Sequence, residues 1–213
     1  MDKFCDKVES CKKSNLENNA MVRIVVSGIE YNPSNPEDIH RTSTSAGSGF
    51  ILDHAQCLKD KKYPWIVTAY HVISGARNIN ISFPTLASKD ASTEWNAVVV
   101  FVIPEMDVAF LQTLQPITVD YRKMNIGESG TLKPGQTISV GGFGSGSMEP
   151  VIVSGVYSRR TFYKKILGNV HHGARIQFDA SINPGHSGSA VCNSNGDVVG
   201  ICTSAQFSNA SER

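Results

Sequence analysis

This sequence has little net charge, no long apolar run, and no sign of export or of a disulfide framework. Its 213 residues include 20 Lys and Arg against 19 Asp and Glu, which gives a formal net charge of +1. A near-neutral chain is a poor match for nucleic acid or an anionic membrane, so we expect neither as a partner. The longest apolar run, residues 97–103, has the length of an interior strand and is too short to cross a bilayer.

The ends and cysteines of the chain lack the features of a secreted protein. Residues 1–7 are charged and contain no apolar core of a secretory signal. The cysteines are odd in number and widely spaced, which favours reduced thiols over disulfides. These residues are Cys5, Cys11, Cys57, Cys192 and Cys202. We therefore expect a cytoplasmic or otherwise intracellular protein with free thiols.

The apolar pattern predicts an all-β fold. After a polar N-terminal extension, residues 1–20, short runs rich in Val, Ile and Phe alternate with clusters of Gly, Pro, Asn and Ser across a domain of residues 21–213. Many short strands without long helical periods indicate a sandwich or barrel. The expected strands are residues 21–26, 48–52, 65–68, 79–83, 95–103, 108–113, 137–141, 151–157, 174–178, 190–192 and 198–202.

Three segments carry the residue types of a nucleophilic catalyst, in the order His, Asp, Ser. His71 follows an expected strand, Asp107 directly precedes another, and Ser187 sits in a glycine-rich turn. A serine hydroxyl is a weak nucleophile at neutral pH and needs a histidine base, which a buried carboxylate must orient. We interpret Ser187 as the nucleophile, His71 as the general base and Asp107 as the orienting carboxylate.

Other interpretations of these motifs are weaker. The turn at Ser187 is similar to the nucleophile elbow of α/β-hydrolases, but there the acid and the histidine follow the serine. No histidine follows Ser187, and Ser189 replaces the last glycine of that elbow. Neither a metal site nor a phosphate loop has its required spacing, so we expect no metal and no cofactor. Loop positions are expected for most of the remaining histidines, which are His40, His54, His171, His172 and His186.

Together the segments resemble trypsin-like serine proteases, and most closely the HtrA/Deg branch. Residues 176–189 read IQFDASINPGHSGS and are similar to that branch's TDA-x-INPGNSGGP. This chain departs from the pattern at His186, where the branch has Asn, and at Ser189-Ala190, where it has Gly-Pro. Three further segments resemble the GSG strand, the T-x-x-HV segment and the D-[ILV]-A-L-L strand of the family: residues 47–51, 66–73 and 107–111.

The resemblance implies a fold and the placement of the site. It implies two six-stranded Greek-key β-barrels, with the first at about residues 21–115, the second at about 135–205, and the active site in the cleft between them. His71 and Asp107 would come from the first barrel and Ser187 from the second. The backbone N–H groups of Gly185 and Ser187 would form the oxyanion hole.

The resemblance also implies a substrate pocket and partners. None of the implied pocket residues is acidic, so we expect cleavage after small aliphatic residues in a protein or peptide substrate. The family also suggests a homo-oligomer, such as a trimer. Two alternatives stay open, namely a viral-type protease that processes a polyprotein, and a protease-like binding or signalling module with little activity. The implied pocket residues are Ser181, Ile182, Thr203, Ser204 and Ala205.

Overall fold

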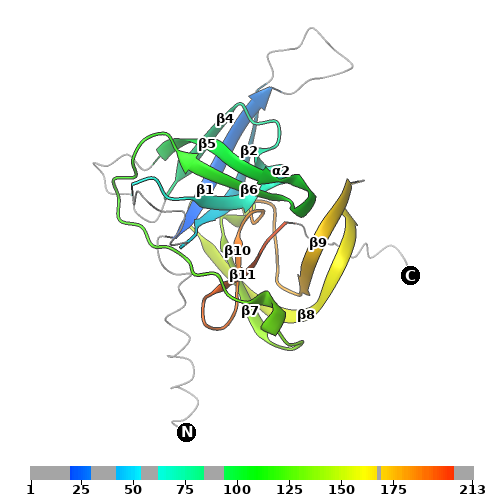
Figure 1. The fold of residues 1–213 in the computed structure, drawn as a ribbon. Coiled ribbons are helices and arrows are strands. Elements are labelled where there is room, and N and C mark those ends of the chain that lie inside the picture. Colours follow the sequence, from blue (N-terminus) through cyan, green and yellow to red (C-terminus); the bar gives the residue numbers. More distant parts are fainter. Residues whose placement is uncertain (1–19, 30–41, 54–61, 84–93, 167–168, 204–213) are drawn as a thin grey trace.

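The structure is a computed structural model that describes residues 20–29, 42–53, 62–83, 94–166 and 169–203. Each run expected to be a strand forms one, so the all-β prediction is confirmed (Figure 1). The strands are β1 (Met21–Ile29), β2 (Thr42–Ile51), β3 (Ile66–Ala69), β4 (Asn78–Ser82), β5 (Glu94–Ile103), β6 (Val108–Thr113), β7 (Thr137–Gly142), β8 (Val151–Ile166), β9 (Asn169–Phe178), β10 (Ala190–Cys192) and β11 (Val198–Ile201). The short helices are α2 (Tyr70–Ile73), η4 (Pro104–Met106), η5 (Ser129–Thr131) and η6 (Gly144–Gly146).

The first half of the chain is a closed barrel. Its strands are hydrogen-bonded in the order β1-β2-β3-β6-β5-β4, and β1 closes the ring by pairing with β4 as well as with β2. Alternate residues of each strand point inward, as the period of two requires. On β1 these are Val22, Ile24 and Val26, all buried in the barrel core. The predicted first barrel is therefore present.

The second half is a curled half-barrel, so the predicted two-barrel architecture is confirmed, with five strands in the second half where six were expected. Five strands are hydrogen-bonded in the order β11-β10-β7-β8-β9 among the described residues. In place of a sixth strand, the connecting segment makes one isolated parallel bridge, between Ile126 and Val198 of β11. Gly127 and Gly130 follow closely and Pro134 lacks an N–H, so this segment is poorly suited to continue the ladder. The sheet therefore curls without closing.

The two halves share one apolar core. It joins Met21, Phe50 and Val67 of the barrel to Phe143 and Ala190 of the second half. Ala20 is also fully buried here, and its carbonyl accepts a hydrogen bond of 2.8 Å from Ile51 N–H. This common core fixes the halves against each other and so determines how residues from both can meet.

The β8–β9 hairpin extends further than the apolar pattern indicated. The basic pairs Arg159-Arg160 and Lys164-Lys165 both lie within β8, whereas the expected strand ended at residue 157. The hairpin forms a long two-stranded ribbon with register shifts near Tyr157 and Thr161 (Figure 1). The outer part of β8 mixes charged residues with Phe162, Tyr163 and Ile166 and has no regular apolar alternation, so its sequence pattern did not predict a strand. The second strand of the hairpin, β9, contacts η4 of the barrel.

No helix among the described residues is long and apolar enough to cross a membrane. Two of the cysteines expected to be reduced are described, and both Cys192 and Cys202 are free and buried. The three other cysteines, Cys5, Cys11 and Cys57, lie outside the described residues. The prediction of free thiols is therefore supported at two positions and stays a prediction at the others.

The two buried thiols should resist alkylation in the folded protein. Burial raises the pKa of Cys202 to about 12, and burial together with the charge of Asp197 raises that of Cys192 to about 12. Because only the thiolate reacts, we expect iodoacetamide at pH 8 to label both at least ~100-fold more slowly than an exposed thiol. Peptide mapping measures the rates, and protein unfolded in guanidinium is the control. Rapid labelling of either residue in the native state would contradict the burial.

Candidate active site

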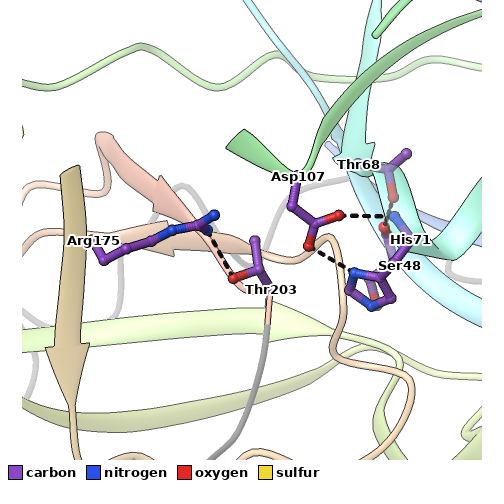
Figure 2. Close-up of polar contacts among 6 residues, drawn as sticks. All are labelled: Ser48, Thr68, His71, Asp107, Arg175 and Thr203. Carbon is purple, nitrogen blue, oxygen red and sulfur yellow. Dashed lines mark hydrogen bonds and ion pairs between the residues drawn. The ribbon is translucent and has the colours of Figure 1, made fainter. Parts of the chain in front are cut away.

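His71 and Asp107 form a tightly bonded pair at the edge of the barrel. His71 Nδ1 lies 2.7 Å from Asp107 Oδ2, and the backbone N–H of His71 donates to Asp107 Oδ1 at 2.8 Å (Figure 2). A carboxylate can only accept, so Nδ1 must carry the ring proton, and the lone pair of the neutral ring is then on Nε2. Asp107 is 5% exposed, whereas the His71 side chain is 46% exposed. The pair therefore has a buried acid and a solvent-facing base.

Local backbone geometry presents Asp107 to the histidine. It follows η4 in a left-handed conformation, with φ of 59°, and its N–H donates to Pro104 O at 3.0 Å. Aspartate tolerates this region better than most residues. Its carbonyl accepts a 3.1 Å hydrogen bond from Tyr70 N–H, so backbone and side chain both hold the start of α2. The strand expected directly after Asp107 is β6, which carries the residue to the core.

The turn that contains Ser187 packs directly against the strand that leads to His71. A Cβ added at Gly188 would lie 2.3 Å from Thr68 Oγ1 and 3.0 Å from the backbone nitrogen of Ala69. Gly188 also has a φ of 87°, which a larger residue would adopt only with strain. The structure thus places the turn of Ser187 against the strand that leads to His71, although Ser187 Oγ makes no hydrogen bond to His71 within the described residues.

Most backbone groups of this turn are already hydrogen-bonded. Pro184 O accepts from Ser145 N–H at 2.7 Å, and His186 O accepts from Ser189 N–H at 2.9 Å. His186 N–H donates to Asn183 O at 3.1 Å, and Gly188 N–H donates to Cys202 O at 2.7 Å. The carbonyls of Gly185 and Ser187 both accept from Ser48, at 2.6 and 2.8 Å.

Two donors of the turn remain unused, and they are the two predicted for the oxyanion hole. Neither Gly185 N–H nor Ser187 N–H has an acceptor among the described residues. In a trans peptide the N–H points away from the preceding carbonyl, so the bonds to Pro184 O and His186 O turn these two donors outward. They are free to bind an oxygen atom of another molecule.

His186 lies in a loop, as expected for most of the remaining histidines, but it is buried there. It is 1% exposed, and its ring packs on Gly144, where an added Cβ would lie only 1.9 Å from Cε1. Its Nδ1 lies 3.3 Å from Asn183 N and 3.2 Å from Asn183 O, while Nε2 is buried without a partner among the described residues. Its place beside a glycine-rich loop, rather than any feature of the surrounding sequence, determines this burial.

The predicted pocket residues are only partly described. Ser181 is exposed and Ile182 is partly buried, whereas Ser204 and Ala205 lie outside the described residues. Thr203 Oγ1 accepts a 3.1 Å hydrogen bond from Arg175, a residue that no sequence pattern singled out (Figure 2). In the sequence, Arg175 looks like any other basic residue on a strand.

Arg175 brings a positive charge close to the His71–Asp107 pair. It projects from β9 toward Thr203, with Asp107 beyond (Figure 2). Desolvation lowers the pKa of Arg175, and the negative charge of Asp107 partly offsets this effect. A second guanidinium nitrogen, Nη2, is buried without a partner among the described residues. The site is therefore poorly suited to accept another cation at this point.

A closed barrel and a curled sheet with a histidine–aspartate pair at their junction define a trypsin-like double-barrel protein. Residues 47–201 match the family described as a trypsin-like peptidase domain, and the chain belongs to this family.

The curated relatives are named serine proteases of the Do-like and HtrA type. The chain is 34% identical over 168 residues to Protease Do-like 1, chloroplastic, of Arabidopsis thaliana, covering 78% of this chain and 34% of that protein. It is 32% identical over 159 residues to periplasmic serine endoprotease DegP of Escherichia coli, covering 74% of this chain and 29% of the relative. The chain thus spans about a third of the length of these relatives.

Solved structures share the fold. An HtrA-type protease, AlgW, with a decapeptide superposes with a TM-score of 0.70 at 22% identity, covering 95% of this chain and 59% of that chain. Deg5 superposes with a TM-score of 0.66 at 23% identity, covering 96% and 87% respectively. The periplasmic and chloroplastic names of the curated relatives do not support the expected intracellular location, which stays a prediction.

Proposed function

We propose that this chain is a serine endopeptidase that hydrolyses peptide bonds through an acyl-enzyme. The observation that carries the proposal is the pairing of His71 with buried Asp107 beside a turn in which the N–H groups of Gly185 and Ser187 have no acceptor among the described residues. The family relationship supports the same activity. The test is hydrolysis of fluorogenic peptides by the purified protein and its loss after treatment with a fluorophosphonate. If the protein hydrolysed none of the peptides in a broad library, the proposal would be contradicted.

In the first half-reaction, Ser187 Oγ would attack the scissile carbonyl. His71 Nε2, the ring nitrogen not bonded to Asp107, would accept the hydroxyl proton and then deliver it to the leaving amine. Asp107 would hold the ring in this tautomer and stabilise the imidazolium. The C–N bond breaks as the ester to Ser187 forms, and the amine leaves with the proton.

In the second half-reaction, a water molecule would attack the ester with His71 again acting as the base. The negative oxygen of each tetrahedral intermediate would be bound by the N–H groups of Gly185 and Ser187. Each such donor typically contributes about 100- to 1,000-fold to turnover. The positive φ of Gly185, 97°, and the closeness of Phe143 O, 2.5 Å from an added Cβ, both disfavour any other residue there.

Cleavage should follow small aliphatic residues. Ile182 is partly buried, and the carboxylate of Asp179, the nearest acid in sequence, is engaged by Val156 N–H at 2.5 Å. The charge of Arg175 beside Thr203 further disfavours a basic side chain in the pocket. A peptide-library profile should therefore favour Val, Ala and Leu, with steps of about 1–3 kcal/mol per methylene. Preference for Lys, Arg, Asp or Glu would contradict this specificity.

Ile182→Ala provides a matched test of the pocket. If the Ile182 side chain limits the size of the pocket, its truncation should raise the relative rate for Phe over Val at the cleaved position. Ser194→Ala, an exposed change elsewhere in the second half, should leave the profile as it is. An unchanged profile in Ile182→Ala would remove this residue from the pocket wall.

The second candidate is a protease-like binding module. The lack of a hydrogen bond between Ser187 and His71 favours this candidate, because a serine that no base activates would also lack this bond. Catalytic hydrogen bonds are often long before substrate binds, so the same geometry is compatible with an enzyme. A module would bind peptides without reacting with the fluorophosphonate, which separates the two candidates.

A further inference from the structure

We propose that Ser48 of the barrel is the positioning residue that fixes the oxyanion turn of the second half; this inference rests on the proposed function. Ser48 is on β2, far from Ser187 in sequence, and is completely buried. A polar side chain at such a position needs hydrogen-bond partners. Its partners are groups of the turn and of the loop beside it.

The Ser48 hydroxyl links two segments of the second half. It donates to Gly185 O at 2.6 Å and accepts from Phe143 N–H at 2.8 Å. The Gly185 carbonyl belongs to the peptide unit between the two proposed oxyanion donors. Rotation of that unit would move both neighbouring peptide units, so the hydroxyl restrains the direction of both N–H groups.

The Ser48 backbone adds two more restraints. Its N–H donates to Ser187 O at 2.8 Å, and its carbonyl accepts from Thr68 Oγ1 at 2.7 Å. Thr68 lies three residues before His71 on β3, the strand that leads into α2. Ser48 therefore connects the Ser187 turn to the segment that carries the base, across the junction of the two halves.

The close packing around Ser48 leaves no room for another arrangement. A Cβ at Gly142 would lie 2.7 Å from Ser48 Oγ, and one at Gly188 would lie 2.1 Å from Ser48 O. Gly47 is equally confined, since its added Cβ would lie 2.6 Å from Val72 Cγ1 and 3.2 Å from Ser187 O. Gly142 and Gly188 therefore let two backbone segments of the second half approach the serine.

Ser48→Ala separates the hydroxyl from the backbone contacts, because it removes the bonds to Gly185 O and Phe143 N while keeping Ser48 N and O. We expect the second-order rate of fluorophosphonate reaction at Ser187 to fall by about 10- to 100-fold, the size of effect seen when an oxyanion donor is weakened. With the best library peptide, kcat should fall by a similar factor while KM changes less than about 3-fold. A purely structural role would instead lower the folded fraction and leave kcat per folded molecule unchanged.

The controls keep the two proposals distinguishable. Ser154→Ala removes an exposed hydroxyl whose hydrogen-bond partner among the described residues is Ser139, so this variant should react like the wild type. Ser48→Cys replaces the hydroxyl with a somewhat larger thiol that is only a weak donor, so it should also lose reactivity even if the alanine variant does not fold. A wild type that does not react would overturn the proposed function itself. A reactive wild type with equally reactive Ser48→Ala and Ser48→Cys variants would overturn only the role of Ser48.

Discussion

Ser187→Ala is expected to reduce kcat for peptide hydrolysis by about 10⁴- to 10⁶-fold. The methyl group cannot attack a carbonyl, so the acyl-enzyme route is lost entirely, and only binding and the oxyanion donors remain. The turn should keep its shape, because its hydrogen bonds use backbone groups of Ser187 and not its hydroxyl. Substrate KM, or the Kd of an uncleaved peptide, should therefore change little. Steady-state kinetics with a fluorogenic peptide measures both quantities.

Ser194→Ala is the matched control for this variant. Ser194 is exposed and its hydroxyl makes only a long contact, 3.5 Å, to Thr137 O. Its activity should equal that of the wild type. Retention of wild-type hydrolysis by Ser187→Ala, in a preparation free of contaminating protease, would show that Ser187 is not the nucleophile.

Asp107→Asn is expected to lower kcat by about 10³- to 10⁴-fold. An asparagine has the shape of the aspartate, but its amide NH₂ can place a donor opposite His71 Nδ1 and so favour the tautomer with the proton on Nε2. That tautomer cannot accept the proton of Ser187. The Asp107→Asn substitution also removes the negative charge that stabilises the imidazolium formed during the reaction.

Asp120→Asn tests whether the effect belongs to this carboxylate. Asp120 is exposed and has no hydrogen bond to His71 among the described residues, so its amide variant should keep full activity. Kinetics at several pH values and a thermal unfolding curve should accompany both variants. Equal activities for the two variants would mean that Asp107 does not orient the base.

The sequence predicted the strands well because most of them bury one face. The inward alternation of Val22, Ile24 and Val26 is visible in the sequence and corresponds to the barrel core. The position of Asp107 before a strand was predictable for the same reason, since β6 is a strongly apolar run. The identities of the His, Asp and Ser segments then followed from their order along the chain.

The sequence could not predict strands without apolar alternation, or features that depend on distant contacts. The outer part of the β8–β9 ribbon has no regular apolar alternation, so apolar periodicity did not predict it. The second sheet stays open because the connecting segment before β7 makes only one isolated bridge to β11 among the described residues, between Ile126 and Val198. No local pattern carries that information.

The structure also adds residues to the candidate site. Ser48 is a polar residue between two glycines, directly before the apolar end of its strand, Phe50 and Ile51, and this setting could have marked it for a structural role. Its partners, however, are 137 and 95 positions away in the sequence. Arg175 gave no comparable signal, since its nearness to Asp107 follows from the contact of β9 with η4.

Covalent labelling of the folded protein with a fluorophosphonate is the most direct test of the proposed activity. A fluorophosphonate reacts with a serine only when a base and an oxyanion site activate that serine. Labelling therefore shows that the nucleophile, base and oxyanion site are assembled, and it does not require the physiological substrate. Intact mass and peptide mapping should find one adduct per chain, on Ser187, and none on Ser187→Ala or on heat-unfolded protein. A folded wild type without an adduct, or with the adduct on another serine, would contradict the assignment.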